Sequence, residues 1–111
     1  MAGAVANPLA GEVALVLDGQ RHVLKLTLGA LAELETGLGT QSLVDLVARF
    51  EGGGFSGRDV LALIVAGLRG GGWQGRAEAL VTTEIEGGVT EAARVAAALL
   101  AGAFVLPEMP G

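Results

Sequence analysis

Cysteine is absent from the 111 residues of this chain, and aromatic side chains make up only 4% of them. Without cysteine the protein forms no disulfide, and zinc sites built from thiolates are excluded. Histidine occurs once and lysine once, whereas arginine occurs six times. One histidine and no thiolate supply too few ligands for a transition-metal site, so we expect neither a metal nor a cofactor.

Positive charge and long apolar runs are also scarce. Seven Lys and Arg stand against twelve Asp and Glu, a formal net charge of −5, whereas nucleic-acid binding needs a clustered basic patch. The longest uncharged stretch, residues 95–107, is shorter than the about 18–20 apolar residues that cross a bilayer. Residues 1–11 lack the positive start of a secretory signal. The excess of arginine over lysine and the abundance of Ala, Gly, Val and Leu are typical of a high-GC bacterial genome. We therefore expect a bacterial cytoplasmic protein that contacts neither nucleic acid nor membrane.

Small aliphatic residues and glycine dominate what is present. Hydrophobic residues make up 51% of the chain, and glycine occurs 19 times. A chain of this length forms one domain and buries about two thirds of its unfolded surface. We expect a flexible N-terminal arm at residues 1–10, a single domain at 11–104, and an apolar, proline-containing tail at 105–111.

A β-hairpin is predicted at the start of the domain. Two aliphatic runs, residues 11–18 and 21–27, flank the Asp18-Gly19 pair. Asp-Gly supplies the positive φ angles of a type I′ turn, so the two runs pair as antiparallel strands. In that register Glu12 lies opposite Lys25, and we expect an ion pair between them. The outer edge of the first strand is a candidate site for β-augmentation.

The pattern becomes helical after Thr27, a plausible N-cap. Helices are expected at residues 28–38, 43–50, 57–68, 76–86 and 90–103. The third begins with the capping-box pair Ser56 and Asp59 and is uncharged over 60–68, so it belongs at the centre of the fold. The fold class is α+β, an N-terminal β-hairpin followed by a bundle of four or five short helices.

Helical spacing also predicts which side chains face inward. Leu28 and Leu34 share one face of the first expected helix, and Val81 lies on the inner face of the fourth. Asp45 and Arg49 are spaced as an i, i+4 ion pair on the second.

The residues that could carry chemistry are few and poorly placed. His22 lies within a strand with no nucleophile near it in sequence, and we expect it to be a partly exposed strand residue rather than a general base. Glu33 and Glu35, like Glu84 and Glu86, are two residues apart and do not face each other on a helix. We expect no catalytic residue and no enzyme.

Glycine clusters stand at the predicted helix ends. Residues 52–57 formally match G-x-G-x-x-G, but no strand precedes them, so a nucleotide-binding loop is not expected. Helix termination and tight turns explain the clusters best, and hinge mobility is the alternative, with residues 70–72 its best candidate.

Candidate partner-binding residues are the large apolar side chains outside the predicted core. Trp73 stands in a polar, glycine-rich stretch, where it serves equally well as an interface anchor or as a core residue. Phe104, Val105 and Leu106 begin the apolar tail, and exposure there would indicate a binding segment.

Three parts of the sequence together resemble the small tail proteins of gene transfer agents and related siphophage-like particles. They are residues 13–19 leading into 24–35, residues 43–50, and residues 66–72. The most specific part is L-T-L-G-A-L-A-E-L-E at 26–35, directly after the Asp-Gly hairpin. The resemblance extends over residues 11–104 and leaves Trp73 unassigned.

This resemblance implies a non-enzymatic tail assembly chaperone of a phage-like particle, acting on the tape-measure and tail-tube proteins. Self-association would be compatible with that role. A minor structural subunit of the tail or of the head–tail joint is the alternative, and a small enzyme is a third, weaker one. A structural subunit would be present stoichiometrically in purified particles, whereas a chaperone would be absent or scarce.

Overall fold

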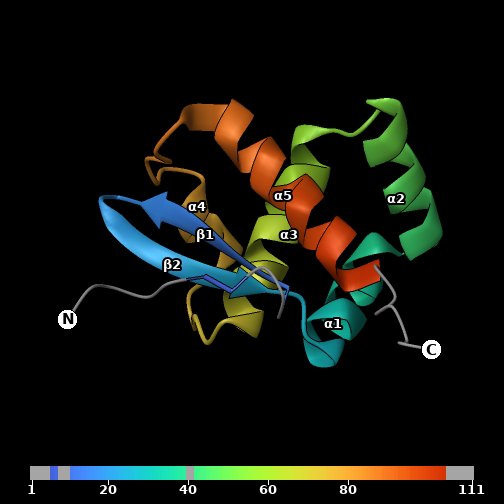
Figure 1. Ribbon diagram of the computed structural model, residues 1–111, viewed down its shortest axis with the longest axis horizontal. Coiled ribbons are helices and arrows are strands. Elements are labelled where there is room, and N and C mark those ends of the chain that lie inside the picture. Colours follow the sequence, from blue (N-terminus) through green and yellow to red (C-terminus); the bar gives the residue numbers. More distant parts are fainter. Residues whose placement is uncertain (1–5, 8–10, 40–41, 105–111) are drawn as a thin grey trace, which may run out of the picture.

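The computed structural model describes residues 6–7, 11–39 and 42–104, so most of the expected arm and all of the expected tail lie outside the described residues. A two-stranded antiparallel sheet comes first and helices follow, which confirms the predicted α+β class (Figure 1). The elements are β1 (Glu12–Leu17), β2 (Gln20–Lys25), α1 (Leu28–Leu38), α2 (Leu43–Gly52), α3 (Gly57–Gly70), α4 (Ala77–Leu80) and α5 (Gly88–Phe104).

The hairpin turns at Asp18-Gly19, as predicted. Asp18 has φ 49° and Gly19 has φ 79°, and the strands pair in the predicted register with Glu12 opposite Lys25. The predicted ion pair between these two residues is wrong. The Glu12 carboxylate instead accepts a hydrogen bond of 2.8 Å on Oε1 from the backbone N–H of Asn7.

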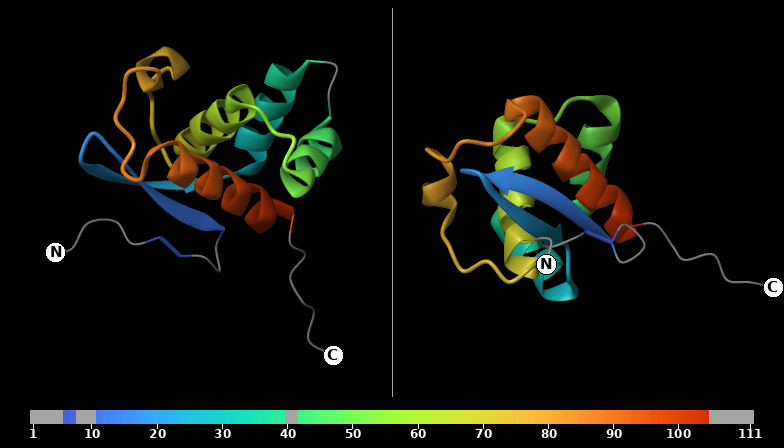
Figure 2. Two further views of the ribbon diagram at one scale, coloured as in Figure 1. Left: turned by 90° about the horizontal axis from the view of Figure 1, so that it is seen from above. Right: turned by 60° about the vertical axis from the view of Figure 1, so that its left-hand side comes forward.

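Helix α3 lies at the centre of the fold, as its uncharged run predicted (Figures 1 and 2). It packs against β2, α1 and α5, and Leu63 in its middle is fully buried. Gly67 lets these elements approach closely, because a Cβ atom there would lie 2.7 Å from Leu99 Cδ1 and 3.1 Å from Leu24 Cβ. The core therefore forms between α3, the inner face of the hairpin and α5.

Two glycines at the end of α3 lie directly against the backbone of β2. A Cβ atom on Gly70 would overlap the carbonyl oxygen of Lys25, and one on Gly71 would overlap the carbonyl oxygen of Val23. These residues end the helix, as expected, but they also permit a contact that no other residue type allows. Close packing, rather than hinge mobility, accounts for glycine at both positions.

The fourth helix is much shorter than predicted. It ends at Leu80 because residues 84–86 pair with the outer edge of β1 instead of continuing the helix. Asp18 donates its N–H to the Glu84 carbonyl at 2.8 Å, and Glu86 donates to the Val16 carbonyl at 3.0 Å. Val81, expected to face inward, is therefore 75% exposed.

The first helix also departs from its predicted inner face. Thr27 caps it as expected, accepting a hydrogen bond from the N–H of Ala30. Ala30 and Leu34 are buried, whereas Leu28 is 84% exposed, since it lies on a different side of the helix from these two residues. Within the described part of the chain, no helix is long and apolar enough to cross a membrane.

Candidate functional site

The described residues form no catalytic or metal-binding centre. They contain no group of three or more His, Asp or Glu side chains that could hold a metal ion. His22 lies half-buried on β2 opposite Leu15, as expected for a strand residue. The hydroxyl oxygens of Ser42 and Ser56 accept hydrogen bonds from backbone N–H groups at helix starts. The two serine hydroxyl groups, which could otherwise act as nucleophiles, therefore stabilise helix starts.

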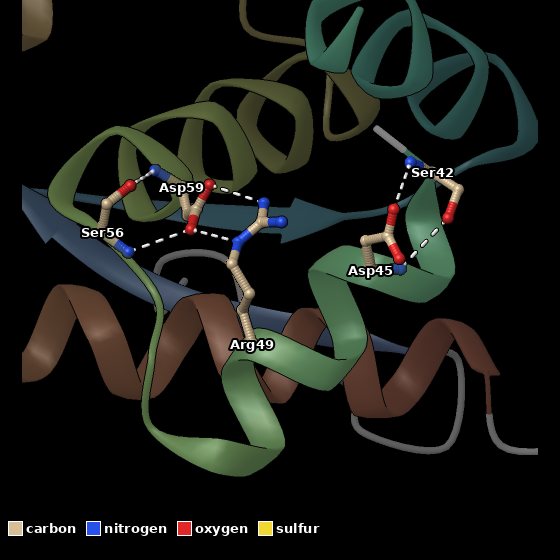
Figure 3. Close-up of polar contacts among 5 residues, drawn as sticks. All are labelled: Ser42, Asp45, Arg49, Ser56 and Asp59. Carbon is tan, nitrogen blue, oxygen red and sulfur yellow. Dashed lines mark hydrogen bonds and ion pairs between the residues drawn. The ribbon is translucent and has the colours of Figure 1, made fainter. Parts of the chain in front are cut away.

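The most organised polar cluster joins α2 to α3 (Figure 3). The Arg49 guanidinium donates from Nε and Nη2 to the two carboxylate oxygens of Asp59, each at 2.9 Å. Asp59 also closes the predicted capping box with Ser56, accepting from its N–H at 2.9 Å. The expected Asp45–Arg49 pair is wrong, because the Asp45 carboxylate accepts from the Ser42 N–H in the capping box of α2.

Electrostatics keep this cluster charged at neutral pH. Hydrogen bonds from the Arg49 guanidinium hold the pKa of Asp59 below its ordinary value of 3.8, although partial burial opposes the shift. The same hydrogen bonds raise the pKa of Arg49. Neither group exchanges protons near neutral pH, so the cluster is suited to fastening two helices rather than to acid–base chemistry.

An apolar groove separates α2 from α5. Its volume is about 300 Å³, and Val47, Phe50, Leu100 and Phe104 are its larger lining residues. The Phe50 ring stacks on Phe55 with centroids 4.5 Å apart, which fixes one wall. Phe104, a predicted contact residue, is 47% exposed at the end of this groove. Val105 and Leu106, also predicted to bind a partner, lie outside the described residues.

A second groove runs between α1 and α3 and has a volume of about 260 Å³. Small side chains leave it open, with Gly37 on α1, Ala62 and Ala66 on α3, and Ala77 on α4. Arg58 stands on its rim, exposed and without an ion pair to any described residue. We call this the α1–α3 groove.

A third groove, the α3–α5 groove, has a volume of about 200 Å³ and no charged side chain in its lining. It is flanked by Val89, which is 81% exposed at the start of α5. The exposure of Val81 and Val89 escaped prediction, since helical spacing counted Val81 as inward and gave no reason to single out Val89.

Trp73 lies apart from all three grooves. Its side chain is half-buried and packs against the core, and the backbone N–H of Trp73 donates to the Leu68 carbonyl at 2.9 Å. Gly75 lies directly against the indole ring, where a Cβ atom would overlap it. Trp73 and Phe104, predicted as contact residues, therefore occupy different places on the molecule and do not form one site.

Comparison with known protein families gives a match over most of the chain. A family model described as "Phage tail tube protein, GTA-gp10" matches residues 10–105. No curated protein and no solved structure matches the chain. The match confirms the predicted gene transfer agent and phage-tail family, but the predicted role as a tail assembly chaperone is wrong, because the matched family is a tail tube protein, a structural subunit.

Proposed function

This chain belongs to the family of the phage tail tube protein GTA-gp10, and from that membership we propose that it is a structural subunit of the tail of a phage-like particle. The family match carries the proposal, since it extends over residues 10–105 and thus over the hairpin and every described helix. Placement in the tail tube itself is the most direct extension of that match.

The physical character of the surface supports a role in protein contacts. Ser42 and Ser56 cap helices and Asp59 pairs with Arg49, whereas Val81, Val89 and Phe104 expose apolar area. Exposed apolar groups beside grooves are typical of surfaces that bind other proteins. The net charge of −5 favours solubility of free subunits before assembly.

The partners follow from the proposed role. Copies of this chain and other tail proteins would be its contacts, and the expected tape-measure protein would be a neighbour enclosed by the tube. Phe104 is the better placed of the described contact candidates, because it lines the α2–α5 groove while Trp73 packs on the core. Assembly would take place in the bacterial cytoplasm.

Quantitative mass spectrometry of purified particles tests this role. Particles are purified, and copies of this chain are counted against the major capsid protein with isotope-labelled reference peptides. We expect many copies in each particle, as a tube subunit requires. Deletion of the gene should leave particles without complete tails in electron micrographs, and a plasmid copy should restore them. Absence of the chain from tailed particles would contradict the proposal.

A further inference from the structure

The charged residues of the described chain that lack a partner are unevenly distributed over its grooves. Arg58 is the unpaired cation on the α1–α3 groove, where Glu33 is already paired with Arg69. Arg76 and Glu78 are both exposed on either side of Ala77, which lines the same groove, so Arg58 is the unpaired charge within the lining itself. The α2–α5 groove instead carries Glu51, and the α3–α5 groove has no charged lining residue. The α1–α3 groove is therefore the apolar surface that favours an acidic partner.

One exposed segment of the same chain has the matching character. Residues 81–89 begin and end with valines that are 75% and 81% exposed, and both Glu84 and Glu86 between them are exposed without an ion pair to described residues. Two other exposed apolar residues, Leu28 and Val44, lack this combination. Leu28 has no unpaired carboxylate beside it, and the carboxylate of Asp45, next to Val44, caps a helix.

The backbone holds this acidic segment in place. Hydrogen bonds join Glu84 and Glu86 to the edge of β1, and Ile85 between them packs on the core. In extended backbone the residues on either side of an inward residue point outward together, so both carboxylates face away from the core. A rigid segment loses little conformational entropy when it binds, which favours association.

We propose that the 81–89 segment of one copy of this chain docks into the α1–α3 groove of a second copy. Glu84 and Glu86 lie against Arg58 and Arg76, and the exposed valines contact the small side chains that line the groove. The groove is smaller than the usual small-molecule pocket, and aliphatic side chains suit its size. This inference deepens the proposed function by naming a contact between subunits.

The 81–89 segment and the α1–α3 groove are two different surfaces, which adjoin at α4, where Ala77 of the groove lining lies four residues before Val81. Figure 2 shows residues 81–88 beside the hairpin turn at one end, with α1 towards the other end. A contact between two different surfaces of identical chains is heterologous, and repetition of such a contact produces rings or open stacks. Both are arrangements from which a tube can be built.

Charge reversal with mixing tests the docking. Sedimentation velocity would follow the full chain, an Arg58→Glu/Arg76→Glu variant, a Glu84→Lys/Glu86→Lys variant, and an equimolar mixture of the two variants. Each variant alone brings like charges together, and we expect its association constant to fall at least about tenfold. The mixture restores opposite charges at every contact and should associate within about threefold of the unmodified chain.

Matched variants control for charge alone. Arg21→Glu reverses an exposed cation of the hairpin, and Glu35→Lys reverses an exposed carboxylate outside the 81–89 segment; both should associate normally. Circular dichroism would verify that every variant folds. The docking is overturned if the unmodified chain stays monomeric up to about 1 mM, if the reversals have no effect, or if the mixture does not recover.

A cysteine trap gives an independent readout of the contact. Because the chain has no cysteine, Ala62→Cys in one copy and Val89→Cys in another introduce the only thiols. Oxidation of their mixture should yield the mixed disulfide faster than oxidation of Ala62→Cys with Val44→Cys, a valine exposed to 76% on α2. Equal rates would overturn the docking. Equal rates would leave the count of this chain in purified particles unaffected. The proposed function is therefore tested separately from the docking.

Discussion

At the scale of single residues, the glycines at the end of α3 both end a helix and allow a close contact with a strand. Gly70 and Gly71 end the helix, and the same missing side chains admit the backbone of β2. The sequence could predict the first purpose, because glycine runs at helix ends are a local signal. It could not predict the second, because the carbonyl oxygens of Val23 and Lys25 come near only after the chain has folded.

Substitution Gly70→Ala tests that close approach. The added Cβ atom would overlap the Lys25 carbonyl oxygen, and backbone yields less readily than a flexible side chain. We expect the free energy of unfolding in urea to fall by about 1–3 kcal/mol. Gly52→Ala is the matched control, since no atom lies within 4 Å of its added Cβ atom and it also stands at a helix end. Similar losses for both variants would contradict the account.

Arg49 illustrates at the element scale where spacing rules fail. An i, i+4 interval pointed to Asp45, but Asp45 occupies the N3 position of its own capping box and Asp59 offers both carboxylate oxygens from the next helix. The capping box of α3 was predictable, because Ser56 and Asp59 are three residues apart. Which arginine would reach Asp59 depends on how α2 folds back, and no local pattern contains that information.

A pH series on Asp59→Asn tests the ion pair between α2 and α3. Because the folded protein holds the Asp59 pKa below its ordinary value of 3.8, the charged carboxylate stabilises the fold fully above that pH. This stabilisation is lost as the pH falls through the lowered value of the folded state. The stability difference between the unmodified chain and the variant should therefore be largest near neutral pH.

Urea unfolding between about pH 7 and about pH 3 would show that difference shrinking with acidity. Glu35→Gln changes an exposed carboxylate that makes no ion pair with described residues, and its effect should stay small throughout. A stability difference for Asp59→Asn that grows as the pH falls would refute the assigned role of Asp59.

Across the whole molecule, the sequence predicted the kinds of element better than their arrangement. The Asp-Gly turn and the uncharged run of residues 60–68 are local signals, and both led to correct elements. The break after Leu80 was missed because it depends on pairing of residues 84–86 with β1, far away in sequence. The grooves were missed for the same reason, since each forms between helices whose packing partners are not encoded locally.

The sequence indicated the family of the protein correctly but not its role within that family. Residues 26–35 after the hairpin pointed to the correct phage-tail family, but the choice between a chaperone and a structural subunit came from the family match. An Ala-rich and Leu-rich helical surface suits either role, because both require contact with other proteins. The distinction lies in what remains in the finished particle.

Cryo-electron microscopy of tails from purified particles tests the central claim most directly. The account predicts that the hairpin with its five described helices fits repeating density in the tail wall, with residues 81–89 of one copy against the α1–α3 groove of the next. A tail map fully explained by other chains, with no density for this fold, would contradict the account.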